Sequence, residues 1–134
     1  MSAIIILQSA DYKAVPLPKS LAVHAEFTWN HGEPRRRSGV YESSGHTLSL
    51  SKADIDAFAQ QVEDVTAFLS HHADVWRTYV QALRHPSAEL VLTSFISPQG
   101  AAQELTLPVK LIAAAGNLGM SISLRTFLTG ESEA

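Results

Sequence analysis

Apolar and polar positions along the chain follow two different periods, which predict a mixture of strands and helices. Residues 3–8 form a continuous apolar run, typical of a central strand that is buried on both faces. Residues 25–30 alternate between apolar and polar, as in a half-buried strand, and residues 47–50 follow as a short return strand. We therefore expect these last two segments to form a hairpin with a long loop.

The middle of the chain has helical spacing. Apolar residues recur every three or four positions over 55–69, which predicts an amphipathic helix of about four turns. Ser51, followed three residues later by Asp54, is expected to cap the N-terminus of this helix. A second apolar series over 75–83 has the same spacing. The sequence leaves open whether residues 52–84 form one helix or two that separate near Ser70.

The C-terminal part contains two strands with a helix between them. Residues 89–96 are rich in β-forming residues and predict a strand. Residues 105–118 predict a short buried helix with Pro108 near its N-terminus. Residues 120–125 alternate as a last strand, and the acidic residues 129–134 are expected to form a flexible tail.

The order of these elements predicts a single α+β domain that spans residues 1–134. We expect a mostly antiparallel sheet of about four to five strands, with two or three helices packed on one face. A chain of 134 residues is long enough to bury one core, and its 46% apolar and 17% charged residues are typical of a folded globular protein.

Composition and charge exclude several classes of function. The chain has no cysteine, which rules out disulfides, thiol catalysis and cysteine-ligated metals and favours a cytoplasmic protein. The apolar run near the N-terminus is too short for a bilayer and has no basic residue before it, so we expect no signal peptide and no membrane contact. A net charge of −3 argues against nucleic acid as the partner.

Residues 29–45, WNHGEPRRRSGVYESSG, carry most of the candidate chemistry. Guanidinium groups recognise carboxylates and phosphates, and aromatic rings provide stacking faces near them. Arg, Trp and Tyr are also the residue types that anchor protein interfaces. The alternative interpretation is a solvated hairpin loop without a partner. The interface candidates are Trp29, His31, Glu33, Arg35, Arg36, Arg37 and Tyr41.

No motif in the chain predicts a catalytic or metal centre. His71 and His72 are adjacent, so they point in different directions on a helix and cannot pair as ligands on one face. The serines lack a nucleophile-elbow motif, and we expect no cofactor and no metal. An enzyme or small-ligand module that uses His31 or His46 with Glu33, in a pocket near residues 29–46, is the alternative hypothesis.

Three segments resemble a bacterial family, domain-of-unknown-function family 4279. They are GEPRRRSGVYESSG (32–45), the long amphipathic helix, and LPVKLIAAAGNLGMSISLRTFL (107–128), and the resemblance covers residues 11–128. The chain departs from the family at AVPLPKS (14–20), where a helix is expected, and at residues 45–46, where a second tryptophan is expected. The resemblance implies an α+β fold and carries no activity.

These observations favour a non-catalytic protein-binding module over an enzyme. We expect the partner to be another protein, and an immunity protein that neutralises a toxin by direct binding is one form of this hypothesis, by analogy with other small α+β domains. A structural subunit that forms a homodimer through a strand edge or through the 71–85 helix is a further alternative.

Overall fold

The computed structural model describes residues 3–96 and 104–128, and these form one α+β domain. The expected fold class is confirmed: the described residues form one five-stranded, mostly antiparallel sheet with four helices. The elements in chain order are β1 (Ala3–Ser9), α1 (Lys19–Ala22), β2 (Ala25–Trp29), β3 (Ser44–Ser51), α2 (Phe58–His71), α3 (Ala73–Gln81), β4 (Ser87–Ile96), α4 (Val109–Asn117) and β5 (Met120–Leu128).

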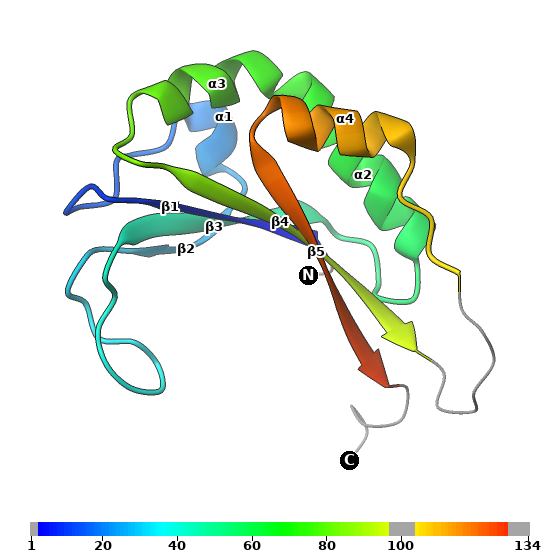
Figure 1. The fold of residues 1–134 in the computed structure, drawn as a ribbon, viewed down its shortest axis with the longest axis horizontal. Helices are drawn as coiled ribbons and strands as arrows, with labels where there is room; N and C mark the ends of the chain where they lie inside the picture. Colours follow the sequence, from blue (N-terminus) through cyan, green and yellow to red (C-terminus); the bar gives the residue numbers. More distant parts are fainter. Residues whose placement is uncertain (1–2, 97–103, 129–134) are drawn as a thin grey trace.

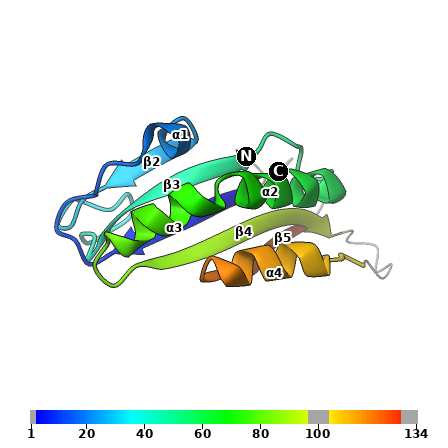
Figure 2. The same cartoon turned by 90° about the horizontal axis from the view of Figure 1, so that it is seen from above.

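The sheet has the strand order β2-β3-β1-β4-β5, with the apolar strand β1 in the centre. Neighbouring strands are antiparallel except β4 and β5, which are parallel and are connected through α4. All four helices lie on the same side of the sheet (Figures 1 and 2). No helix of the described residues therefore covers the opposite face of the sheet.

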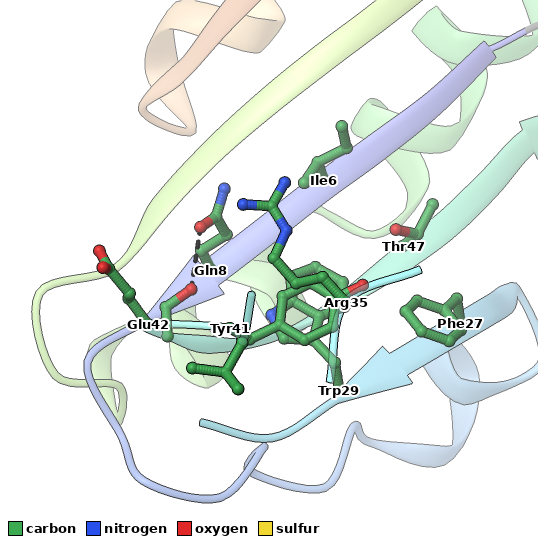
Figure 3. A pocket seen from close by; sticks show the side chains of 10 residues that line it. Ile6, Gln8, Phe27, Trp29, Arg35, Tyr41, Glu42 and Thr47 are labelled. Atoms are coloured by element: carbon green, nitrogen blue, oxygen red, sulfur yellow. Dashed lines mark hydrogen bonds between the residues drawn. The ribbon is translucent and has the colours of Figure 1, made fainter. Parts of the chain in front are cut away.

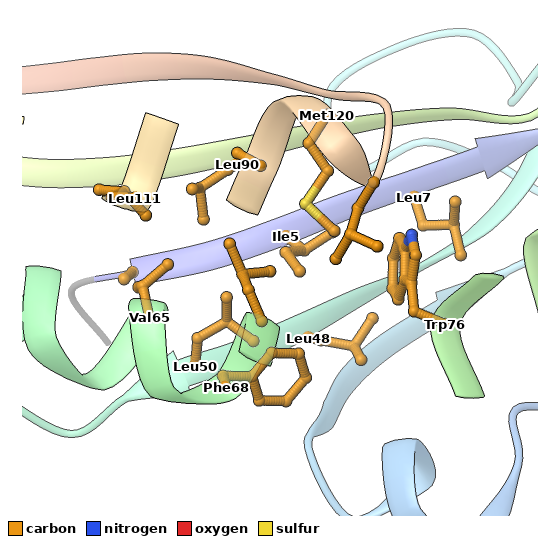
Figure 4. Close-up of a cluster of buried hydrophobic side chains, with 14 of the residues drawn as sticks. Ile5, Leu7, Leu48, Leu50, Val65, Phe68, Trp76, Leu90, Leu111 and Met120 are labelled. Carbon is orange, nitrogen blue, oxygen red and sulfur yellow. The ribbon is translucent and has the colours of Figure 1, made fainter. Parts of the chain in front are cut away.

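The hydrophobic core lies between the sheet and the helices (Figure 4). Alternate residues of each strand point into it, because successive side chains of a strand face opposite sides of the sheet. Full burial of a Leu or Ile side chain stabilises the fold by about 1.5–3 kcal/mol. Fully buried members of this core include Ile5, Leu7, Leu48, Leu69, Trp76, Leu90, Leu92 and Leu111.

The expected N-cap at Ser51 is wrong. Ser51 is the last residue of β3 and pairs with Ala3 of β1, so the sheet holds it in an extended conformation. Its hydroxyl donates a hydrogen bond to Oδ2 of Asp64 at 2.6 Å. The chain needs residues 52–57 to cross from the sheet to the helix layer, and α2 begins only at Phe58.

The long helical region is divided into two helices. α2 ends at His71 and α3 begins at Ala73. His72 between them has backbone angles of φ −107° and ψ 12°, outside the helical region. The sequence allowed either one helix or two, and the structure shows two. The expected tail at 129–134 lies outside the described residues.

Candidate binding site

Residues 30–43 connect β2 to β3 and fold into a small hairpin of their own, on the side of the sheet away from the helices (Figure 1). The amide of Gly32 donates to the carbonyl of Tyr41 at 2.8 Å, and the amide of Tyr41 donates to the carbonyl of Glu33 at 2.9 Å. Nearer the tip, the amide of Arg35 donates to the carbonyl of Gly39 at 3.0 Å. Gly32 and Gly39 have φ of +86° and +77°, which residues with a Cβ rarely adopt. The expected long loop is thus an ordered structure.

Two of the predicted interface residues hold the base of this hairpin. The carboxylate of Glu33 accepts a hydrogen bond from the amide of Asn30 at 2.6 Å. The amide of His31 donates to the carbonyl of Tyr12 at 3.0 Å, and the two rings lie 5.1 Å apart. The Asn30 side chain also accepts a hydrogen bond from the amide of Ala14 at 2.8 Å. His31 and Asn30 therefore hold the hairpin against the N-terminal segment, and Glu33 closes the base of the hairpin itself.

Three aromatic residues form a cluster on the uncovered face of the sheet, and we refer to Phe27, Trp29 and Tyr41 as the aromatic cluster. The Trp29 ring is stacked 5.4 Å from the Tyr41 ring and 5.8 Å from the Phe27 ring. Trp29 is only 6% exposed, whereas Phe27 is 52% exposed. Trp29 is thus the support of the cluster, and Phe27 and Tyr41 present their surfaces to solvent.

The aromatic cluster forms one wall of a cleft of about 570 Å³ (Figure 3). Ile6, Gln8 and Thr47 of the central strands line it from the sheet, and the hairpin supplies the remaining side chains. The volume falls within the range of about 300–1,000 Å³ that is typical of ligand sites. The hairpin residues of the cleft are Arg35, Val40, Tyr41, Glu42 and Ser43.

Arg35 lies over the aromatic cluster and points into the cleft (Figure 3). Its guanidinium carbon is 5.7 Å from the centre of the Tyr41 ring, a cation–π arrangement that orients the side chain. Arg36 and Arg37 are exposed at the tip of the hairpin. In the part of the chain that the structure describes, the one ion pair joins Arg77 to Asp74, so no carboxylate there neutralises these three guanidinium groups.

His46 has a structural role on the other side of the sheet. It pairs with Leu7 and points toward the helices, where it is buried. Its Nε2 lies 2.9 Å from the carbonyl of Val15, which can only accept, so Nε2 carries the proton. Nδ1, the other ring nitrogen, lies 2.8 Å from the hydroxyl oxygen of Thr28. Neither His46, His31 nor Glu33 lines the cleft, so the residues of the enzyme hypothesis are not brought together there.

Phe27, Val40 and Gly45 were not among the residues predicted for the site. A Cβ on Gly45 would lie 2.6 Å from Cζ2 of Trp29, so this glycine creates the space for the indole ring. The alternation over 25–30 already places Phe27 on the same face as Trp29. The sequence could not show that no helix among the described residues covers this face, which leaves Phe27 exposed.

The described residues contain no group of three or more His, Asp or Glu side chains that could hold a metal ion. Among the helices that the structure describes, none has the length and apolar character needed to cross a membrane. Comparisons with protein-family models, with curated proteins and with solved structures give no significant match.

Proposed function

We propose that the protein is a non-catalytic module that binds another protein at the cleft on the uncovered face of its sheet. One observation carries the proposal: an ordered hairpin holds Arg35 over an aromatic cluster at the edge of an open cleft. Aromatic and Arg side chains contribute most of the binding free energy in protein interfaces. The side chains that line the cleft are therefore suited to binding a partner.

The site is organised before any partner arrives. The hairpin is fixed by its backbone hydrogen bonds and by the Glu33 carboxylate, and Trp29 is held between the sheet and Tyr41. Ordering a loop on binding lowers affinity, so a fixed hairpin favours binding. Phe27 and Val40 are each 52% exposed at this fixed site, which leaves apolar surface for a partner to bury.

In its specific form, the proposal is a cytoplasmic bacterial immunity protein that neutralises a toxin by direct binding. The small size of the domain supports it, as does the resemblance to domain-of-unknown-function family 4279, which stays a prediction. If the gene beside this one encodes a toxin, co-expression of this protein should restore growth. Restored growth by a variant with Arg35, Arg36 and Arg37 all changed to Ala would exclude the hairpin as the interface.

Site-specific photo-crosslinking tests the broader proposal. A photoreactive amino acid would replace Val40 in the cleft, or Val109 on α4 as the matched control, since Val109 is 81% exposed on the helix side of the sheet. Expressed in the source cells, the Val40 variant should form one discrete adduct with another protein, and the Val109 variant should not. Equal adducts from both positions, none from Val40, or an adduct between two copies of this chain would overturn the proposal.

A small-ligand module is the second candidate, because the cleft volume suits a small molecule. A thermal-shift screen of nucleotides, sugars and carboxylates separates the two functions. A ligand that raises the melting temperature of the wild type but not of Arg35→Ala would favour the second candidate. Protein binding predicts that no small molecule in the screen has this effect.

A further inference from the structure

We infer that the cleft takes an acidic segment of a partner protein in which a carboxylate side chain lies next to a bulky apolar side chain. This inference rests on the proposed function and names the chemistry of its partner. It follows from how positive charge and apolar surface are arranged around the cleft.

The positive charge at the cleft is available to a ligand. No described carboxylate lies within ion-pair distance of Arg35, Arg36 or Arg37. The carboxylate of Glu33, the nearest acidic side chain in sequence, is already engaged by the amide of Asn30. A planar guanidinium that is held over an aromatic ring presents its donors in the fork that matches a carboxylate.

The apolar surface lies beside this charge. Phe27 and Val40 are half exposed and line the same cleft as Arg35. Ile6 of the central strand β1 also lines this cleft. A small inorganic anion would leave this apolar surface in contact with water. A segment with both an apolar and an acidic side chain would use both parts of the cleft, because buried apolar area adds to the charge interaction.

Glu42 makes the two ends of the cleft electrostatically different. It lines the cleft at the end away from Phe27, beside Gln8 and Ser43, whose side chains share a hydrogen bond of 2.9 Å (Figure 3). An incoming carboxylate is repelled at the Glu42 end and attracted at Arg35. The acidic side chain of the segment should therefore lie at Arg35 and away from Glu42, with the apolar side chain toward Phe27.

Chemical-shift titration of the full chain with short peptides tests this inference. The probes are a peptide of alternating Glu and Leu, one of alternating Lys and Leu, one of alternating Glu and Ser, and a short oligothymidylate. The two indole N–H groups serve as reporters, because neither has a hydrogen-bond partner among the described residues. Trp29 lies at the cleft, whereas Trp76 lies in the core on the other side of the sheet. The Glu–Leu peptide should shift the Trp29 signal and leave the Trp76 signal unchanged.

Charge variants give the decisive comparison. Arg35→Gln should weaken binding of the Glu–Leu peptide by about tenfold, the loss expected for one charged hydrogen bond. Glu42→Gln should strengthen it by about twofold to threefold, because it removes a repulsion on the partly screened surface. Arg77→Gln, remote in the sequence on α3, is the matched control and should leave the affinity unchanged.

Several results would overturn the inference. Binding of the Lys–Leu peptide that Glu42→Gln weakens would mean that the cleft prefers a basic segment. Equal binding of the Glu–Ser peptide or of oligothymidylate would mean that negative charge alone is recognised. Absence of binding by every probe, together with a Val40 adduct in cells, would reject the acidic segment but leave the proposed function standing.

Discussion

Gly45 and Trp29 lie opposite each other on β3 and β2, and the absence of a side chain at Gly45 leaves room for the indole ring against the sheet. A Cβ at this position would be 2.6 Å from Trp29 and closer still to the carbonyl oxygen of Leu7. Both distances are shorter than any van der Waals contact. The position of the aromatic cluster therefore depends on this glycine.

Gly45→Ala should destabilise the fold by about 1–3 kcal/mol, because it overpacks the contact with β1 and displaces Trp29. Urea unfolding measures the change. Gly116→Ala is the matched control: a Cβ added at Gly116, inside α4, would meet no atom within 4 Å. There the substitution should leave stability unchanged or raise it by up to about 1 kcal/mol. Equal losses from both would refute the contact argument.

Gln61 satisfies the backbone of β4 at Thr93, the residue that follows Leu92, which pairs with Ala3 of β1. Its side-chain amide donates to the carbonyl of Thr93 at 2.6 Å and accepts from the Thr93 amide at 3.2 Å. Gln61→Leu should cost about 2–4 kcal/mol, since it leaves both buried backbone groups unpaired. Gln60→Ala, on the exposed side of α2, should change stability by less than about 0.5 kcal/mol. A loss below about 1 kcal/mol for Gln61→Leu would contradict this role.

Tyr79 gives the fold a sensitivity to high pH. Burial, and then the charge of Asp11, raise its pKa from 10.0 to about 12, and its hydroxyl donates to the carbonyl of Val15 at 2.5 Å. The unfolded chain therefore loses this proton first. The stability that the protonated Tyr79 hydroxyl contributes is complete below pH 10 and is lost as the pH rises through 12. The free energy of unfolding should fall over this interval, as measured by urea titration at a series of pH values.

Tyr79→Phe should lower stability at pH 8 by about 1 kcal/mol, through loss of the hydrogen bond, and should flatten the fall at high pH. Tyr12→Phe is the matched control, because Tyr12 is exposed and no described hydrogen bond involves its hydroxyl. That variant should keep the wild-type fall. If Tyr79→Phe also keeps the wild-type decrease in the free energy of unfolding at high pH, groups other than Tyr79 cause that decrease.

His72, at the α2–α3 junction, makes the fold sensitive to mild acid. The His72 ring lies 4.5 Å from Phe68, 4.7 Å from His71 and 5.5 Å from His24. Burial, followed by the charges of His71 and His24, lowers the pKa of His72 below 6.5. The unfolded chain binds this proton more readily, so stability is complete above pH 6.5 and is lost as the pH falls through the lower pKa.

His72→Gln should reduce the loss of melting temperature between pH 7.5 and pH 5. His31→Gln, which changes a histidine outside this group, should leave that loss unchanged. Differential scanning fluorimetry over this pH range measures both variants. An unaltered pH profile for His72→Gln would assign the loss to other groups.

The sequence predicted the strands and helices where periodicity was strong and misplaced the start of α2 where local and tertiary signals compete. Ser51 with Asp54 has the pattern of a helix start, but pairing with Ala3 holds Ser51 in the sheet. The residues predicted for the site lie in or beside one hairpin, and they divide into several structural roles. Glu33 and His31 brace the hairpin, Trp29 supports the cluster, and Arg35 and Tyr41 face the cleft.

What could not be predicted depends on three-dimensional arrangement. Phe27 and Trp29 lie on the same face of β2, but whether that face is covered depends on which side the helices pack. From the sequence, His46 is a candidate for an enzyme or small-ligand site, but in the fold its two ring nitrogens contact Thr28 and Val15. Non-local contacts of this kind leave no periodic signal in the sequence.

The most direct test of the central claim is the affinity for the protein that crosslinks at Val40. Phe27→Ser and Arg35→Ala should each weaken that complex by at least about tenfold, as expected for central interface residues. Val109→Ser, on the other side of the sheet, should change the dissociation constant by less than about twofold, as expected for a residue outside the interface. A complex that tolerates both cleft substitutions but is lost with Val109→Ser would contradict the claim that the uncovered face binds the partner.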